Sequence, residues 1–404
     1  MKLSKFMCAA FAAAMVLVGC NKENETPVDD GSNGFKSVTL KLENVAAALT
    51  KLPSEDYIGN SDNVYLSSFQ VFFSDGTNLF EAYNVDQSAP AETFFKLPDD
   101  LTTTKQFHYL PHAVNEVLVI GNFQDKINLG TVGEGKKYSL SRQELRTQIN
   151  QLKIEEQQDP KNLKLFGTDQ VLSETTDHAE QHGNVVYAAN VTLKPAVARF
   201  EITGFKCDAE DASGIRLYEN VKIQQLTART YFEKATVAVS GESALTVTGE
   251  QLDAFNEHSY TVTDGNAPSY FNAVAGKGWF SDDLDITLQG GVWEVGNTNP
   301  TTAAPYTTVD PANVLYSYHV FPGKAPQFLA KILASSAGVD VPLYLKTNSI
   351  RTQDGILDGE KVVAGNIYRL SFNFVDTSFD QPEKCVDLTV SVAQWSVNVL
   401  TPIF

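Results

Sequence analysis

Hydrophobic positions after residue 35 recur in short segments rather than over long helical stretches. Within a segment, apolar and polar residues alternate or β-branched and aromatic residues run together, and Gly, Pro, Asn or Asp separates it from the next. The clearest segments are Val38 to Leu42, Val64 to Phe73, Glu116 to Gly121, Val185 to Leu193, Arg199 to Phe205, Thr236 to Val239, Ile367 to Phe374 and Val386 to Val392. The pattern predicts an all-β fold of the sandwich type.

One segment has helical features instead. Ser141 is placed to cap a helix N-terminus, and Glu144, three residues later, can complete a capping box. Leu145, Ile149 and Leu152 follow at the spacing of one helix face. We predict a short helix here that packs across the N-terminal sandwich.

The mature length fits two or three domains. Lys194-Pro195-Ala196 interrupts the strand pattern, which predicts an N-terminal sandwich over 36–195 and a C-terminal sandwich over 196–394. Residues 254–312 are rich in Gly, Asn, Thr and Pro and have poor periodicity, so we expect long loops there, where binding specificity could reside.

The first residues have the layout of a secretory signal peptide. Two lysines precede an apolar run that ends in Leu17-Val18-Gly19-Cys20 and is too short to span a bilayer. Leu-Val-Gly-Cys resembles the lipobox of bacterial lipoproteins, which predicts a signal peptide over 1–19 and a lipid on Cys20 that anchors the chain in the outer membrane. The polar residues 20–35 read as a flexible tether.

Charge and cysteine content narrow the classes of partner. The formal net charge of −18 argues against nucleic acid and anionic membrane surfaces as partners. Cys207 and Cys385 remain after processing in a compartment that permits disulfides, and they can be paired or free.

Candidate metal and nucleotide motifs are incomplete. His108 and His112, like His178 and His182, have i, i+4 spacing, but Pro111 and the polar surroundings favour solvated loop histidines over a zinc site. Residues 130–137 (Gly-Thr-Val-Gly-Glu-Gly-Lys-Lys) come close to a phosphate-binding loop. They lack the Ser or Thr that would bind magnesium, and a Gly-rich turn is the favoured interpretation.

No residue pattern carries catalysis. No Gly-x-Ser-x-Gly elbow is present, and the acidic pairs Asp282-Asp283 and Glu155-Glu156 are typical of solvated surface on so acidic a chain. We therefore expect a protein that is not an enzyme and that has no cofactor and no metal.

Several segments, taken in order, resemble the fimbrillins, the major fimbrial subunits of type V pili in Bacteroidota. The matching segments are Ser37 to Leu42, Asn115 to Asn122, Val197 to Ile202, Gly365 to Leu370 and Leu388 to Trp395. The resemblance implies two transthyretin-like β-sandwich domains and a surface-exposed lipoprotein precursor that becomes part of a fimbrium.

The resemblance also implies how subunits would join. A protease removes the first strand, here within 36–51, and the C-terminal strands of another subunit fill the gap. The best-known fimbrillins are cut after Arg, but this chain has no Arg before Arg142, so the matching cut falls between Lys51 and Leu52. The partners expected are identical or related pilin subunits, a processing protease and a host or bacterial surface receptor.

Residues 395–404 are the predicted donor strand. Val38, Leu40 and Leu42 alternate with polar residues in the first strand, and Trp395, Val397 and Val399 alternate with polar residues in the same way. The two segments could therefore fill one groove. The alternative is that 395–404 closes its own C-terminal sandwich.

Two other functions stay open at this point. The first is a surface glycan-binding lipoprotein, and the second is a non-polymerising anchor or tip subunit of the same fimbria. The aromatic residues that could form a sugar platform are Tyr270, Phe271, Trp279, Phe280 and Trp293.

Overall fold

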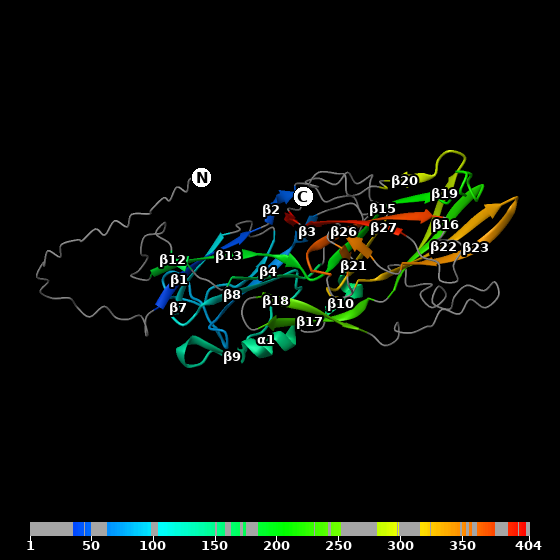
Figure 1. The fold of residues 1–404 in the computed structure, drawn as a ribbon. Helices are drawn as coiled ribbons and strands as arrows, with labels where there is room; N and C mark the ends of the chain where they lie inside the picture. Colours follow the sequence, from blue (N-terminus) through cyan, green and yellow to red (C-terminus); the bar gives the residue numbers. More distant parts are fainter. Residues whose placement is uncertain are drawn as a thin grey trace, which may run out of the picture.

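The structure of the chain is a computed structural model. The residues that it describes are 35–43, 45–49, 63–97, 104–149, 152–157, 163–169, 173–174, 185–229, 231–240, 244–251, 281–296, 298, 316–323, 325–347, 350–352, 355–357, 362–375, 387–394 and 396–400. These residues form an all-β fold built from two pairs of packed sheets (Figure 1).

The first pair of sheets is formed by the N-terminal half of the chain. One sheet has the order β12-β13-β1-β7, and the other has the order β14-β11-β8-β4-β5-β9, with β6 beside β4. The strands of the first sheet are β1 (Phe35–Glu43), β7 (Thr104–Pro111), β12 (Ser173–Glu174) and β13 (Val185–Thr192). Those of the second are β4 (Ser68–Ser74), β5 (Asn78–Phe80), β6 (Phe94–Lys96), β8 (Glu116–Gly121), β9 (Lys137–Ser141), β11 (Leu165–Asp169) and β14 (Lys194–Pro195).

The second pair of sheets is formed mainly by residues after 197. One sheet has the order β20-β15-β26-β27-β24-β25, with β21 beside β15, and the other has the order β19-β16-β22-β23. The first contains β15 (Ala198–Asp208), β20 (Glu294–Gly296), β21 (Tyr316–Val320), β24 (Ile350–Thr352), β25 (Gly355–Leu357), β26 (Asn366–Val375) and β27 (Asp387–Gln394). The second contains β16 (Asn220–Arg229), β19 (Ser281–Gln289), β22 (Gln327–Ser336) and β23 (Val339–Lys346).

Aromatic side chains join the two sheets within each pair. Phe73 of β4 meets Phe107 of β7 edge to face, with ring centroids 4.9 Å apart. In the second pair, Phe328 of β22 lies edge to face against Phe372 of β26 at 6.1 Å. Both distances lie within the range of favourable aromatic pairs, so these contacts add to the burial that holds each pair together.

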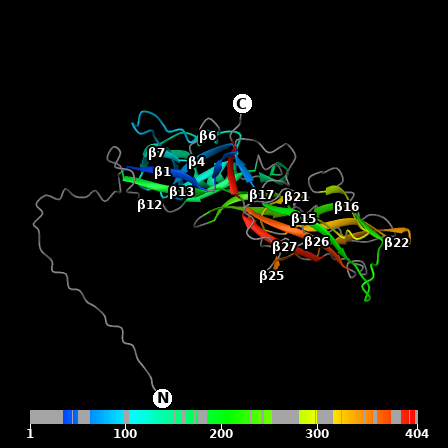
Figure 2. The same cartoon turned by 90° about the horizontal axis from the view of Figure 1, so that it is seen from above.

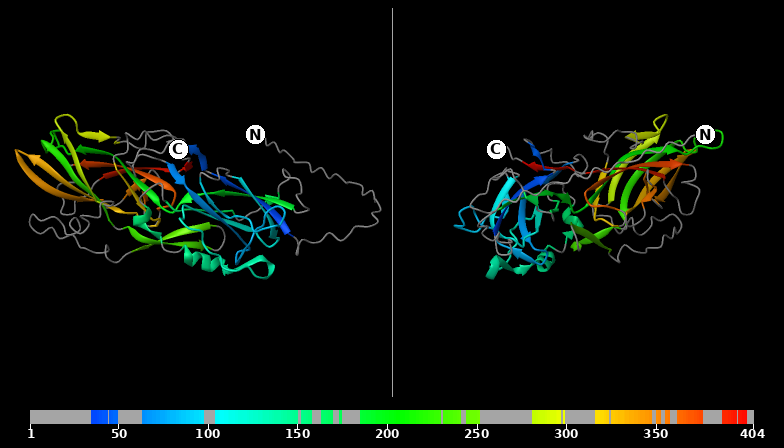
Figure 3. Two further views of the ribbon diagram at one scale, coloured as in Figure 1. Left: turned by 180° about the vertical axis from the view of Figure 1, so that it is seen from behind. Right: turned by 60° about the vertical axis from the view of Figure 1, so that its left-hand side comes forward.

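Two smaller sheets connect the halves, which lie end to end in Figure 2. The hairpin of β17 (Phe232–Ser240) and β18 (Ala244–Gln251) leaves the second pair of sheets, and β17 pairs with β10 (Leu152–Lys153) beside α1 (Figure 3). The other small sheet has the order β2-β28-β3, from β2 (Val45–Leu49), β3 (Asn63–Leu66) and β28 (Ser396–Leu400). The chain therefore crosses between its halves more than once.

The predicted helix is confirmed. α1 spans Arg142–Gln148, Ser141 is its N-cap, and the reciprocal hydrogen bonds of a capping box with Glu144 are both present. Leu145 and Ile149 are buried, whereas Leu152 belongs to β10 rather than to the helix. Two short 3-10 turns occur at Glu134–Lys136 and Ile154–Gln157.

The predicted segment Val64 to Phe73 is two strands, not one. It bends at Ser67, whose backbone N–H donates to the side-chain oxygen of Asn122 at 2.8 Å. The Asn122 amide group donates to the carbonyl oxygens of Tyr65 and Leu163 at 2.6 and 2.7 Å. One buried amide thus bonds to backbone groups at the bend and also to a carbonyl oxygen just before β11.

Residues 130–137 form a turn, as the favoured interpretation expected. Gly130 and Gly135 have φ of +80° and +68°, values that favour glycine, and a 3-10 turn leads from this segment into β9. The helix begins only at Arg142, after that strand, so the segment does not have the loop-to-helix geometry that cradles a phosphate.

Candidate functional site

β1 is an internal strand that is paired along both edges. It runs parallel to β13, from Lys36 opposite Val185 to Glu43 opposite Thr192, and antiparallel to β7. Removing β1 would therefore open two ladders at once and leave a gap in the middle of a sheet.

The inward face of β1 is apolar and fully packed. Val38 and Leu40 have no exposed surface and Leu42 keeps 4%, whereas Lys41 on the opposite face is exposed. Burial of three side chains of this size contributes roughly 5 to 9 kcal/mol, an upper estimate because an unfolded chain already buries part of its apolar surface. Their positions match the predicted apolar alternation of the first strand.

Polar contacts fix the beginning of β1. The buried Lys36 ammonium group donates to the carbonyl oxygen of Val114 and lies 4.7 Å from the ring centroid of Tyr187. Burial lowers the pKa of Lys36 to about 8. Beside it, Ser37 Oγ lies 3.0 Å from Nδ1 of His108, which is buried on β7.

The prediction that both histidines lie in solvated loops is wrong for His108 and correct for His112. His108 belongs to β7, where residues on both sides of it pair with β1, and its side chain is buried. His112 is exposed in the turn after that strand. His178 and His182 lie outside the described residues.

Phe35 joins a group of aromatic rings around the Lys136 ammonium group. Lys136 Nζ is 4.4 Å from the ring centroid of Phe35 and 3.9 Å from that of Tyr83, and it donates to the carbonyl oxygen of Tyr109 at 3.1 Å. Burial lowers the pKa of Lys136, and the Glu81 carboxylate opposes that shift. Since Phe35 is on β1, this contact ties the strand to the turn before β9.

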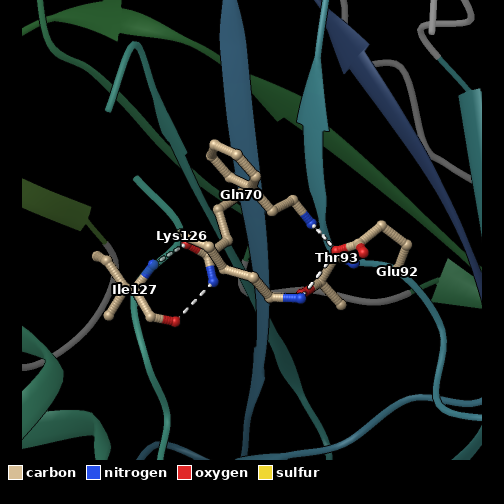
Figure 4. Close-up of polar contacts among 6 residues, drawn as sticks. Gln70, Glu92, Thr93, Lys126 and Ile127 are labelled. Atoms are coloured by element: carbon tan, nitrogen blue, oxygen red, sulfur yellow. Dashed lines mark hydrogen bonds and ion pairs between the residues drawn. The ribbon is translucent and has the colours of Figure 1, made fainter. Parts of the chain in front are cut away.

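The sheet that faces β1 is held by side chains that fasten its loops (Figure 4). Gln70 on β4 makes two bonds with one residue: its Nε2 donates to the carbonyl oxygen of Ile127, and its Oε1 accepts the Ile127 N–H at 2.8 Å. Glu92 accepts from Lys126 Nζ and from the Thr93 N–H, each at 2.9 Å. Burial acts to raise the pKa of Glu92, but these hydrogen bonds and the Lys126 charge outweigh it, so the pKa is lowered. The sheet that packs against β1, called here the floor of the groove, is thus stabilised by contacts that do not involve β1.

The described part of the predicted donor strand, residues 396–400, pairs with neither pair of sheets. Val397 and Val399 lie in β28, which runs parallel to β3, with Val397 opposite Val64 and Val399 opposite Leu66. Its other edge is parallel to β2. The alternative that this strand closes the C-terminal sandwich does not apply to β28, because β27 takes that place beside β26.

Several predicted positions lie outside the described residues. They are Cys20, Lys51, Leu52, Trp395, Cys385, Tyr270, Phe271, Trp279 and Phe280. Lys51 and Leu52 belong to the connection between β2 and β3. Among the candidate sugar-binding aromatics, Trp293 is described: it packs against the core, and the Arg216 guanidinium carbon lies 4.6 Å from its ring centroid. Cys207 is free and buried on β15, and this burial raises the pKa of its thiol.

An ionic cluster on β15 and β26 was not predicted. Glu201 on β15 lies 2.9 Å from Arg199 on the same strand and 2.9 Å from Arg369 on β26, and all three side chains are almost fully buried. The nearby His319 is also buried, with Nδ1 2.7 Å from the carbonyl oxygen of Gln157. Burial, with a contribution from Arg199, lowers the pKa of His319 to about 3, so its ring is neutral at ordinary pH.

Two other kinds of site are absent from the described residues. No helix there is long and apolar enough to cross a membrane. Within the same residues, no group of three or more His, Cys, Asp or Glu side chains is placed to hold a metal ion.

The fold resembles several solved structures. A protein from Parabacteroides distasonis named for a proposed role in cell adhesion is 13% identical, with 93% of this chain and 98% of that chain covered and a TM-score of 0.47. A similarly named protein from Bacteroides eggerthii is 13% identical over 92% and 98%, at 0.45. A fimbrilin from Porphyromonas gingivalis is 11% identical over 90% and 98%, also at 0.45.

No family model and no curated protein matches the chain.

Proposed function

We propose that this chain is a structural subunit of a cell-surface fimbria, which polymerises by protease-triggered strand exchange and contributes to adhesion. The observation that carries the proposal is the position of β1, paired along both edges, with Val38, Leu40 and Leu42 buried beneath it. The resemblance of the sequence to the fimbrillins supports the same assignment.

Loss of β1 would leave a groove with a strong tendency to accept another strand. The facing edges of β13 and β7 would expose unpaired backbone groups, and the floor would expose apolar side chains. Strand addition restores both kinds of contact, and donor-strand complementation of pilins is an established case of this mode of recognition. The contacts of Gln70 and Glu92 with their loops do not depend on β1, so they favour a floor that keeps its shape after β1 is lost and before a new strand enters.

The C-terminal residues have the pattern needed to fill that groove. Val397 and Val399 lie in β28, so the segment already has strand conformation. Their alternation with Ser396 and Asn398 repeats the alternation of Val38 and Leu40 with Thr39. A donor strand from a second copy would therefore offer both the ladder and the apolar row that β1 provides.

The precursor would be anchored before assembly through lipid on Cys20, and the cut would fall between Lys51 and Leu52. Cleavage there separates β1 and β2 from β3. We expect Cys20→Ser to prevent fatty-acid labelling and surface display, since the thiol is the acyl acceptor. Undiminished labelling of this variant would contradict the anchor.

Deletion of 395–404 tests the exchange. We expect the shortened chain to fold cooperatively and to be cut, but to form no filaments, because it can accept a strand and cannot donate one. In the full-length chain, Val397→Asp should also stop assembly, since it would place a charge in the apolar groove. Normal filaments from Val397→Asp, together with unfolding of the shortened chain, would show that the strand serves its own subunit.

A further inference from the structure

β1 and β2 both lie on the N-terminal side of the proposed cut. β1 pairs with the strands that border the proposed groove, and β2 pairs with the proposed donor strand. β1 fills the groove between β13 and β7, whereas β2 pairs with β28. Both strands precede residue 51, and β3, the other neighbour of β28, follows residue 62. In Figure 1, β2 and β3 lie near each other where the dark red end of the described chain reaches them.

The pairing of β2 with β28, here called the latch, has the features of a weak strand pair. It pairs Val45 with Val397 and Ala46 with Asn398, and then shifts register before Leu49 meets Leu400. Both neighbours of β28 are parallel to it, and parallel pairing is slightly less stable per residue than antiparallel pairing. The middle of β2 consists of three alanines, which are depleted in strands.

The ladder between β3 and β28 is more regular. Four consecutive pairs run without a shift from Ser396 opposite Asn63 to Val399 opposite Leu66. Loss of β2 would therefore uncover one edge of β28 and leave the other edge held by a short parallel ladder. An uncovered edge of this kind is open to pairing with another chain.

We infer that one cut between β2 and β3 prepares both ends of the subunit: it frees the groove by releasing β1, and it frees the donor strand by releasing β2. This inference rests on the proposed function and adds its regulation. The uncut chain keeps its own donor strand between β2 and β3, so it can neither accept a strand nor give one. Premature assembly with a subunit that is already cut is thereby prevented.

Donor competence can be measured apart from acceptor competence. The acceptor is a cut chain that lacks 395–404, and the donor is a full-length chain, either cut or uncut. We expect cut wild-type donor to form a stable heterodimer with this acceptor on size-exclusion chromatography. Uncut wild-type donor should form none within the same time.

A pair of substitutions in β2 tests the latch itself. Ala46→Pro with Ala48→Pro removes two N–H groups from β2, and the uncut chain that carries both should donate its strand without cleavage. The matched control, Ala46→Ser with Ala48→Ser, keeps both N–H groups and should behave like uncut wild type. If uncut wild type donates as fast as cut wild type, the latch does not exist.

Hydrogen exchange separates the two proposals. In the uncut proline variant, amides of 396–400 should exchange roughly tenfold faster than in the serine control, the ratio expected for losing one or two backbone hydrogen bonds. Amides of β1 should be unchanged. Equal exchange at 396–400 in both variants overturns the latch. If exchange rises and even cut wild type forms no heterodimer, the latch stands and strand exchange fails.

Discussion

β1 and β15 are the first strands, in chain order, of the two pairs of sheets. Each has a parallel neighbour on one edge and an antiparallel neighbour on the other. β1 runs parallel to β13 on one edge and antiparallel to β7 on the other, and β15 runs parallel to β26 and antiparallel to β20 and β21. The two strands differ in what they bury. β1 buries an apolar row on one face and leaves Lys41 exposed on the other, whereas residues 198–205 of β15 are buried on both faces.

The buried charges make β15 much harder to replace than β1. Removal of β15 would take away Glu201, the buried carboxylate that Arg369 contacts, and breaking a buried ion pair by removing one partner costs about 3 to 5 kcal/mol. Removal of β1 takes the Lys36 charge away with the strand and leaves a backbone carbonyl oxygen, that of Val114, in its place. Under the proposed strand exchange, an incoming apolar strand could therefore replace β1 more easily than β15, and we expect exchange in the first pair of sheets.

Glu201→Ala should have the largest effect on stability. It leaves two arginines, Arg199 and Arg369, without their shared carboxylate, and we expect a loss of about 3 to 5 kcal/mol in the free energy of unfolding by urea. Lys206→Ala is the control on the same strand: its ion pair with Asp208 is 39% and 34% exposed, so the loss should stay below about 1 kcal/mol. Equal losses would remove the distinction between the two strands.

Leu40→Ala should have the next largest effect on stability. Leu40 has no exposed surface in the middle of β1, and truncation of such a side chain costs about 2 to 5 kcal/mol. Lys41→Ala, one residue along and exposed, should change stability by less than about 0.5 kcal/mol. Urea unfolding of both variants measures the contrast, and a tolerant Leu40 would mean that the groove is not closely packed around β1.

Lys36 should make stability depend on pH in the alkaline range. Its pKa is about 8 in the folded chain against 10.5 for an ordinary lysine, so between these values the unfolded chain holds more protons than the folded chain. Stability then rises with pH from about 8 to 10.5, and below that window this group contributes no slope. We expect Lys36→Met to lose this rise in thermal unfolding measured across the window. An identical pH profile in both chains would contradict the burial of the ammonium group.

Phe35→Ala should have the smallest effect. The ring is 42% exposed and its contact with the Lys136 ammonium group is worth about 0.5 to 1 kcal/mol at such a site. Val85→Ala, a truncation at a similarly exposed residue outside the ring cluster, serves as the control. A larger loss for Phe35 than for Leu40, in urea unfolding, would show that β1 is held at its beginning rather than along its apolar row.

Local periodicity was enough to predict much of the fold. Glu116 to Gly121 is the strand predicted, with the same bounds, because a run of apolar residues can be buried on both faces in the middle of a sheet. Ser141 and Glu144 likewise identified the helix start, since a capping box involves residues only three apart. Alternation in β1 correctly indicated which side chains face the core.

Long-range pairing was beyond the reach of the same reasoning. Arg199 and Glu201 occupy the polar positions of an alternating segment, which usually face solvent, but both are buried, and Glu201 pairs with Arg369 of the distant strand β26. His108 is buried for a related reason, because it lies on a strand that pairs with β1 and not in a loop. The place of β28 between β2 and β3 joins segments from opposite ends of the chain, which no local pattern encodes.

N-terminal sequencing of subunits sheared from the surface of cells that make this chain tests the central claim most directly. If β1 is the exchanged strand, filaments should run as a ladder on a gel, and their subunits should begin at or near Leu52, without Phe35–Glu43. Subunits from the same filaments that begin at Cys20 and still contain β1 would contradict exchange of this strand.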